Sequence, residues 1–249
     1  LILPEPPMTN SAHKSVADTY KTREKFAQLD LEIFQRLQAK GLSPQVIYDV
    51  GASDGSWSRD IVEVFPQSQF YLFEPLVNHA PAYQQFMTES LKLHDNFHLY
   101  GVALGEREGT VTLNVFPNLV ASTALPMEGS GLALSTVTVP VLTLDGLVER
   151  GELPIPQIIK IDTQGYEWSI LKGAVQILPQ VSVLLLECWL YRGYGPQTPL
   201  LTELANWLLG FGFHLWDLGD EYRDEGGGLA TVDCLFLNVA SDLCPAWHY

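Results

Sequence analysis

Residues 46–58 read VIYDVGASDGSWS, and this stretch decides the fold of the chain. Its first five residues form a short apolar run with β-branched side chains, which is typical of a buried strand. The run ends in a turn that contains Gly51 and Gly55, and a helical pattern follows from Ser56 to Phe65. A strand, a glycine turn and a helix in this order place backbone N–H groups at the carboxyl end of a strand, where α/β sheets bind ligands.

A second apolar run strengthens this prediction. Residues 70–75 read FYLFEP, so the next predicted strand ends in an acid, Glu74. In dinucleotide folds an acid at this place, about 20 residues after the glycine turn, grips the ribose hydroxyls. Asp49 and Asp54 add carboxylates beside the turn and would repel a pyrophosphate. The two runs favour a nucleoside ligand that carries hydroxyls and a positive charge; the alternative is an ordinary βαβ unit with a well-capped helix.

Composition limits the class of protein. The chain has 249 residues, of which 47% are hydrophobic, enough for one large α/β domain or two small ones. A net charge of −15 argues against a nucleic-acid or anionic-membrane surface, because both need clustered Lys and Arg. The three cysteines form no CxxC pair, the N-terminus does not resemble a signal peptide, and no apolar run is long enough to span a membrane. We therefore expect a reducing, cytoplasmic location.

Seven core strands are predicted from apolar runs that alternate with helical patterns. The last two are joined by a polar turn, 220–228, without a helix, so we expect that pair to be antiparallel. The prediction is an α/β fold with one mostly parallel seven-stranded sheet whose last strand is antiparallel. The strands are expected at 46–50, 70–74, 97–103, 158–162, 181–188, 213–218 and 232–239.

Three further regions are predicted around this core. An arm and a helix over 16–40 make up residues 1–43, and we expect the helix to pack on the sheet rather than to cover the crevice. Residues 44–240 form the main domain, and 241–249 form a tail. A β-rich, antiparallel insertion is expected at about 105–142, between strands three and four. Its loop, 118–134, is either a substrate flap or a surface loop beside an extra sheet edge.

Five short motifs together resemble the FkbM-type methyltransferase family. They are DVGASDG at 49–55, FEP at 73–75, TLD at 143–145, KIDTQGYE at 160–167 and LKGA at 171–174. The resemblance spans about residues 44–240; Ser53 stands where the family usually has Asn, and Asp54 often differs as well. It implies a Rossmann-like class I methyltransferase fold, S-adenosylmethionine as cofactor, and O-methylation of a hydroxyl on a small secondary metabolite or sugar.

The needs of methyl transfer assign roles to the strand ends. Because the donor is a sulfonium, nearby carboxylates and aromatic faces are favourable. Asp49, Glu74 and Asp162 would end three adjacent strands, and we expect Glu74 to bind the ribose hydroxyls. The backbone of Gly51 and Ala52 would pass under the methionine and ribose.

Other contacts follow from position along the chain. Ser58 would hold the methionine carboxylate at the helix start, where an anion is favoured. Val102 and Ala103 would flank the adenine, and His79 would lie on the donor side. Trp189 and Tyr191 are candidate acceptor contacts.

A base must take the proton if the acceptor is a hydroxyl. Asp162 is the first candidate and Glu187 the second, whereas Glu167 is better explained as a helix-capping acid. Gln164 either positions a substrate or fills a turn. No metal motif is present, although Asp162 and Glu187 with Asn206 or Asp217 could assemble an oxygen-rich cation site.

Two alternatives to an O-methyltransferase stay open. The fold could serve as a non-catalytic S-adenosylmethionine-binding or scaffold domain, and the intact Gly51, Glu74 and Asp162 argue only against loss of donor binding. The second alternative is a nicotinamide-dependent dehydrogenase. Asp54 in the turn, the incomplete GxGxxG pattern and the antiparallel last strand argue against it.

Overall fold

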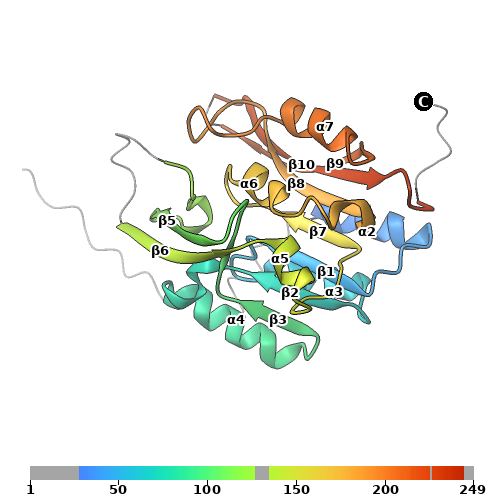
Figure 1. Ribbon diagram of the computed structural model, residues 1–249, viewed down its shortest axis with the longest axis horizontal. Coiled ribbons are helices and arrows are strands. Elements are labelled where there is room, and N and C mark those ends of the chain that lie inside the picture. The colour runs from blue at the N-terminus through green and yellow to red at the C-terminus, as the bar shows by residue number, and fades with distance from the viewer. Residues whose placement is uncertain (1–27, 127–134, 225, 244–249) are drawn as a thin grey trace, which may run out of the picture.

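The computed structural model describes residues 28–126, 135–224 and 226–243. Seven strands form one sheet in the order β3-β2-β1-β7-β8-β10-β9 (Figure 1). β10 runs antiparallel to both neighbours, and the pairs from β3 to β8 are parallel, which confirms the predicted architecture. The strands are β1 (Val46–Val50), β2 (Gln69–Phe73), β3 (Phe97–Tyr100), β7 (Ile158–Ile161), β8 (Val183–Trp189), β9 (Phe213–Arg223) and β10 (Leu229–Asn238).

The register of the central strands brings three loops together. Val50 at the end of β1 pairs with Phe73 on one side and with Ile161 on the other. The three strands are parallel, so they end at the same edge of the sheet. The next residues along each strand, Gly51, Glu74 and Asp162, therefore start neighbouring loops.

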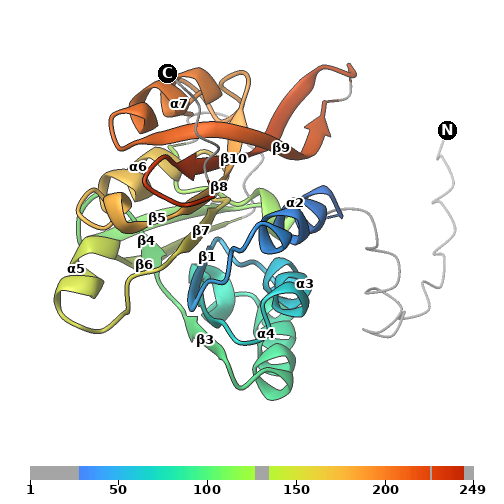
Figure 2. The ribbon, with the colours of Figure 1, turned by 90° about the vertical axis from the view of Figure 1, so that its right-hand side faces the viewer.

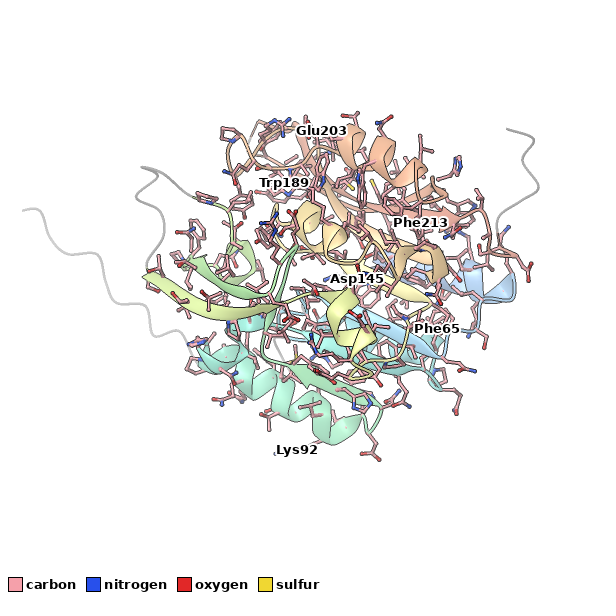
Figure 3. The ribbon with its side chains drawn as sticks, viewed as in Figure 1. Phe65, Lys92, Asp145, Trp189, Glu203 and Phe213 are labelled. Atoms are coloured by element: carbon pink, nitrogen blue, oxygen red, sulfur yellow. The ribbon has the colours of Figure 1, made fainter. Side chains whose placement is uncertain are left out.

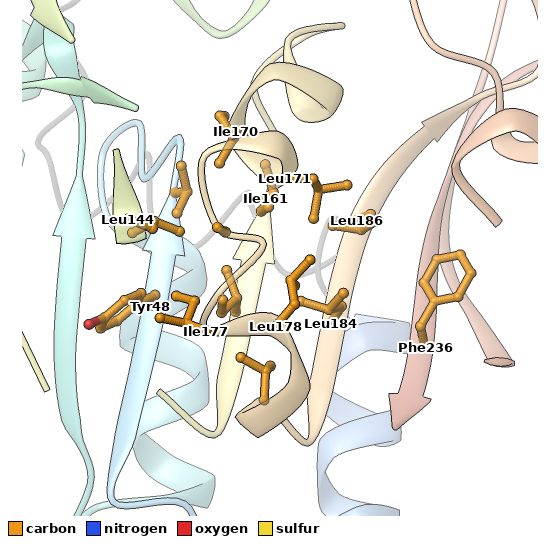
Figure 4. Packing of buried hydrophobic residues seen from close by; sticks show 14 of the residues in the cluster. Tyr48, Leu144, Ile161, Ile170, Leu171, Ile177, Leu178, Leu184, Leu186 and Phe236 are labelled. Carbon is orange, nitrogen blue, oxygen red and sulfur yellow. The ribbon is translucent and has the colours of Figure 1, made fainter. Parts of the chain in front are cut away.

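Helices cover both faces of the sheet (Figures 1 and 2). One face packs on α2 (Gln28–Ala39), α3 (Ser56–Val64) and α4 (Pro81–Leu93). The other packs on α5 (Leu144–Glu149), α6 (Glu167–Lys172) and α7 (Leu201–Leu209). Figure 4 shows Ile170 and Leu171 of α6 packed near Ile161 and Leu186 on this second face. Both faces of β1, β7 and β8 are thus buried, as expected for parallel strands that read as continuous apolar runs.

α2 packs on the sheet, as expected for the helix predicted over 16–40. Its core residues Ile33, Phe34 and Leu37 are buried, and the Phe34 ring meets the rings of Trp57 and Phe65 edge to face at 5.8 and 6.2 Å. The earlier part of the predicted helix, residues 16–27, lies outside the described residues.

The insertion is a second sheet of three strands in the order β4-β6-β5. It contains β4 (Ala103–Leu104), β5 (Gly109–Val115) and β6 (Ser135–Leu142), with β5 and β6 antiparallel as predicted. It packs on the 3-10 helix η1 (Pro75–Asn78) and the start of α4. In the predicted flap, η2 (Leu119–Ala121) and a bridge from Asn114 to Thr123 are formed, and residues 127–134 lie outside the described residues.

Two predicted elements are each divided in the structure. The strand predicted over 97–103 ends at Tyr100, and Ala103 belongs to the second sheet. The chain passes close to Asn78 at Gly101, because a Cβ on Gly101 would lie 2.5 Å from Asn78 Nδ2. The apolar pattern of residues 167–178 predicts one helix, but α6 stops at Lys172, and η3 (Leu178–Gln180) follows. At Gly173 a Cβ would lie 2.0 Å from the carbonyl oxygen of Gly105, so the chain is held there by the insertion.

No helix in the described ranges is long and apolar enough to cross a membrane.

β9 continues to Arg223, so the hairpin turn to β10 is shorter than the predicted polar turn.

Candidate functional site

The glycine turn after β1 is fixed against both neighbouring strands. Gly51 has a φ of 77°, and a Cβ on it would lie 1.9 Å from the carbonyl oxygen of Asp162. The N–H groups of Gly51 and Ala52 both donate to the carbonyl of Phe73 at 3.0 Å. Only glycine fits this contact, because it combines a positive φ with no room for a side chain. The predicted passage of a ligand over Gly51 and Ala52 stays a prediction, and their N–H groups are already used.

Glu74 lies across this turn at the end of β2. One carboxylate oxygen accepts the Ser53 N–H at 2.9 Å, and the other accepts the Leu76 N–H at 2.8 Å. Burial raises the pKa of Glu74 to about 7, although the two backbone N–H donors lower it. Each carboxylate oxygen can accept a second hydrogen bond. The side chain can therefore receive two ligand hydroxyls without losing its backbone partners.

Asp49 and Ser58 lie beneath the turn, and both have no exposed surface. The Ser58 hydroxyl donates to Asp49 Oδ2 at 2.6 Å, and Lys160 Nζ lies 3.4 Å from Asp49 Oδ1. The two residues thus tie α3 to β1 and β7. The predicted contacts of Asp49 and Ser58 with the donor stay untested, and in this arrangement both side chains support the turn from inside.

Lys160 joins the glycine turn to Asp162, a role that the sequence pattern did not predict. Its ammonium lies 3.4 Å from Asp49 Oδ1 and from Asp162 Oδ2, donates to the Gly51 carbonyl at 3.2 Å, and lies 6.0 Å from the Trp57 ring centre. Burial alone lowers the pKa of Lys160, but Asp162 and Asp49 raise it overall, so the side chain stays charged. A lysine inside the apolar run 158–161 is the signal that would have found it, because a buried lysine needs partners.

The two candidate bases meet through one amide. Gln164 Nε2 donates to Asp162 Oδ1 at 3.0 Å and to Glu187 Oε2 at 3.1 Å. The Asp162 side chain is 35% exposed, whereas Glu187 is half-buried. Burial, Asp162 and Glu167 raise the pKa of Glu187 well above its usual range, and the Gln164 hydrogen bond and Lys160 lower it. The structure therefore brings Asp162 and Glu187 together at the edge that also holds Glu74.

More carboxylates lie behind this pair. Asp233 of β10 stands opposite Glu187 in the strand register, and burial raises its pKa well above the usual range, with Asp30 raising it further. Asp30 of α2 is itself buried, and its pKa is raised to about 7 by burial and by Asp220. This end of the sheet is rich in carboxyl groups and favours a cationic ligand over an anionic one.

The family follows from a comparison with known proteins. The model described as "Methyltransferase FkbM domain" matches residues 49–215, which is more than half of the chain. The chain belongs to the FkbM methyltransferase family. This confirms the resemblance seen in the motifs and removes the dehydrogenase alternative.

Similar proteins carry names that describe methyl transfer. The chain is 24% identical over 193 residues to the hexuronic acid methyltransferase AglP of Haloferax volcanii, covering 76% of this chain and 74% of that protein. It is 24% identical over 182 residues to the 2-O-methyltransferase NoeI of Sinorhizobium fredii, covering 66% and 72%. The solved structure of an FkbM methyltransferase from Methylobacillus flagellatus matches with a TM-score of 0.50 and 18% identity. That match covers 82% of this chain but about half, 47%, of the other, and it shows the fold alone.

In this FkbM-family chain, Val102 and Ala103 follow β3 at the same edge as Glu74. The Glu74 N–H donates to the carbonyl of Tyr100, the last residue of β3, at 3.0 Å. Val102 is partly buried, and Ala103 is buried in β4 against the second sheet. Their predicted contact with adenine stays untested. Beyond them lies a cavity of about 230 Å³ between η1, the start of α4 and the insertion, lined by Leu76, His79, Ala80, Pro81, Ala82, Val115, Leu119, Ser135 and Val137.

Aromatic side chains follow Glu187 along the chain. Trp189, at the end of β8, is labelled in Figure 3; its ring lies 5.1 Å from that of Tyr194 and 6.2 Å from that of Tyr191. Tyr191 is 44% exposed, whereas Trp189 is buried. The Tyr194 hydroxyl lies 2.9 Å from Gln164 Oε1 and from the Ala121 carbonyl. The aromatic loop therefore contacts the insertion and Gln164, the residue that bridges the carboxylate pair.

Other motif residues of the FkbM family hold the fold together. Thr143 caps α5 by accepting the Gly146 N–H at 3.0 Å, and Asp145 accepts the Gln176 and Ile177 N–H groups at 3.1 and 3.2 Å (Figure 3). Glu167 has no exposed surface and accepts the N–H groups of Thr163 and Gly165, both at 3.0 Å. Glu167 thus fixes the turn after β7, consistent with a structural rather than a catalytic acid.

The divalent cation site considered from the sequence does not assemble. Asp217 pairs with Arg36, and Asn206 is exposed on α7. Among the residues that the structure describes, no group of three His, Cys, Asp or Glu side chains is placed to hold a metal.

Proposed function

We propose that this protein is an S-adenosylmethionine-dependent methyltransferase that transfers a methyl group to a hydroxyl of a small metabolite or sugar. The observation that carries the proposal is Glu74, whose two carboxylate oxygens each accept one backbone N–H beside the Gly51 turn and each keep a lone pair for a hydroxyl donor. A ribose presents two adjacent hydroxyls, and an acid at the end of the second strand suits them.

The charges at this edge fit the cofactor. The Lys160 ammonium is shared between Asp49 and the partly exposed Asp162, and Glu187 and Asp233 lie beside them. A sulfonium placed beside Glu187 and Asp233, whose pKa values are raised, would favour their ionised forms and gain from that negative charge. When bound, S-adenosylmethionine supplies a methyl group activated by that sulfonium. Glu74 would hold its ribose, and the backbone at Gly51 would form the floor beneath it.

The Asp162 carboxylate would take the proton of the acceptor hydroxyl. It is the more exposed of the two neighbouring acids, and Lys160 and Gln164 fix its two oxygens. The lone pairs that remain can accept from a hydroxyl. Holding that hydroxyl in line with the methyl group is worth about 7–11 kcal/mol through proximity and orientation.

A polyhydroxylated acceptor is favoured by the surroundings of the acids. Tyr191 is exposed two residues after Trp189, which ends β8, and an aromatic face beside carboxylates suits the alternating C–H and O–H surface of a sugar. The names of two relatives, a hexuronic acid methyltransferase and a 2-O-methyltransferase, support the same choice.

Methyl transfer to a set of acceptors tests the proposal. The chain is incubated with S-adenosylmethionine and a hexuronic acid, a deoxyhexose or a long aliphatic alcohol, and both S-adenosylhomocysteine and the methylated product are measured by mass spectrometry. We expect O-methylated sugar, with Asp162→Asn lowering turnover about 100-fold or more, as for loss of a general base. The matched control is Asp217→Asn, because the Asp217 carboxylate pairs with Arg36 away from the proposed site.

Two results would contradict this account. Wild-type turnover in Asp162→Asn would remove the assigned base. Tight donor binding with no transfer to any hydroxyl acceptor would favour the non-catalytic binding domain.

We also propose a cytoplasmic location. Cys188 and Cys234 are buried and free, which suits a reducing compartment.

A further inference from the structure

Gln164 has an unusual backbone conformation at the end of β7. Its φ is 57°, in the left-handed region that residues other than glycine and asparagine rarely adopt. Two contacts with the insertion hold it there. The Thr123 hydroxyl donates to the Gln164 carbonyl at 2.7 Å, and the adjacent Gly165 is so close to the insertion that a Cβ on it would lie 2.8 Å from Leu125 Cδ1. A strained residue that its surroundings hold in place often marks a functional constraint.

The side-chain amide of Gln164 is fully used. Nε2 donates to Asp162 Oδ1 at 3.0 Å and to both oxygens of Glu187 at 3.1 and 3.2 Å. Oε1 lies 2.9 Å from the Tyr194 hydroxyl, which can donate to it. The opposite orientation of the amide would place its oxygen against two carboxylates and leave them without donors, so the assignment follows from the chemistry.

We propose that Gln164 is a positioning residue that holds the Asp162 and Glu187 carboxylates at fixed places. It also links them to the insertion through its carbonyl and to the loop of Tyr194 through its side-chain oxygen. The inference rests on the proposed function for its meaning in catalysis, because these are the two acids assigned to the acceptor side. The contacts themselves do not depend on that assignment.

The physical reason is the repulsion between two neighbouring carboxylates. An amide offers two N–H donors and no charge, so it bridges the acids and stabilises their ionised forms. A shorter side chain cannot reach both acids, and a carboxylate in the same place would add a third negative charge. The titratable groups that face the pair from the packed elements are Lys160 of β7, Glu167 of α6, Asp233 of β10, Asp30 of α2 and Tyr194 of the following loop.

Removing the bridge has a measurable effect on Glu187. In Gln164→Asn the amide is too short to reach Glu187, and asparagine tolerates the left-handed backbone. Gln164→Gly removes the amide and relieves the backbone, so at least one of the two variants is expected to fold. In both, loss of the donor raises the titration midpoint of the Glu187 carboxyl further, by about one pH unit.

The readout is the carboxyl-carbon NMR titration of the full chain without ligand. Glu187→Gln identifies the Glu187 signal, and Gln84→Asn on the exposed face of α4 is the matched control. The same samples are titrated with S-adenosylhomocysteine by calorimetry. We expect the dissociation constants of wild type and Gln164→Asn to agree within about threefold, because the donor contacts lie on the Gly51 and Glu74 side.

The outcomes separate the inference from the proposed function. A Glu187 midpoint that is unchanged in both folded variants overturns the positioning role. A shifted midpoint that appears equally in Gln84→Asn overturns it as well. A shift confined to the Gln164 variants supports it, even if wild type fails to bind S-adenosylhomocysteine, in which case the proposed function fails alone.

Discussion

At the residue scale, three carboxylates at neighbouring strand ends differ in what surrounds them. Asp49 is buried and held by Ser58 and Lys160, Glu74 is buried against two backbone N–H groups, and Asp162 is partly exposed. Asp49 has no exposed surface and supports the turn from inside, whereas Glu74 is 6% exposed and keeps lone pairs for further donors. Asp162 is 35% exposed. A carboxylate group therefore serves as support, as proposed ribose acceptor and as proposed base.

The close contact at Gly51 gives a prediction about folding stability. Gly51→Ala adds a Cβ that would lie 1.9 Å from the carbonyl oxygen of Asp162, on a residue whose φ is 77°. We expect a loss of roughly 3 kcal/mol or more in the free energy of unfolding, from backbone strain and the clash together. Gly151→Ala is the control: its φ is 71°, but nothing lies within 4 Å of the added Cβ, so strain alone costs about 1 kcal/mol. Urea unfolding measures both, and equal losses would show that the contact with β7 is unimportant.

At the scale of elements, α2 is part of the domain core although it lies outside the family match. The match begins at residue 49, whereas α2 buries Ile33, Phe34 and Leu37 on the sheet. Its buried Asp30 also approaches β9, where the Asp220 N–H donates to it at 3.4 Å. α2 thus closes one side of the carboxylate-rich edge.

Truncating the α2 anchor tests this packing. Phe34→Ala is expected to lower the free energy of unfolding by about 3–5 kcal/mol, because the ring is fully buried against Trp57 and Phe65. Leu29→Ala on the same helix, where the side chain is 45% exposed, should change it by less than about 0.5 kcal/mol. Thermal unfolding of both variants measures the difference. A stable Phe34→Ala protein would mean that α2 is a separable arm.

The elements that the sequence predicted are those with a repeating local signal. The buried strands, the glycine turn and the antiparallel last strand follow from apolar runs and from the absence of a crossover helix. The division of the strand at Gly101 and of the helix at Gly173 did not follow, because each depends on a contact with a segment far along the chain, Asn78 and Gly105. In the site, Glu74, Asp162 and Glu187 stand at strand ends as predicted. The roles of Lys160 and Gln164 depend on distances across strands, which no spacing along one strand reveals.

At the scale of the whole molecule, the negative charge of −15 is accompanied by buried carboxyls with raised pKa values. Burial raises the pKa of Asp30, Glu74 and Glu167 to about 7, from ordinary values of 3.8 for Asp and 4.5 for Glu. Between those values the folded state binds more protons than the unfolded state. The stability that these groups contribute is therefore complete at low pH and is lost as the pH rises towards 7.

This predicts an unusual pH dependence of folding. The free energy of unfolding should fall by a few kcal/mol from about pH 5 to about pH 7, since each group contributes up to about 1.4 kcal/mol per pH unit. Urea unfolding at several pH values measures the slope. Glu167→Gln should reduce the slope, whereas Glu89→Gln, at a half-buried position on α4, should leave it unchanged. Stability that rises over this interval would contradict the buried-acid account.

The central claim is that Glu74 and the Gly51 turn hold an S-adenosyl nucleoside, and calorimetric titration with S-adenosylhomocysteine tests it most directly. We predict binding that weakens as the pH falls below about 7, because in the proposed complex the ribose hydroxyls would donate to the ionised Glu74. Glu74→Ala should weaken it at least tenfold, about 1.4 kcal/mol, and NAD should not bind. Affinity that is unchanged in Glu74→Ala, or no binding to the wild-type chain at any pH, would contradict the account.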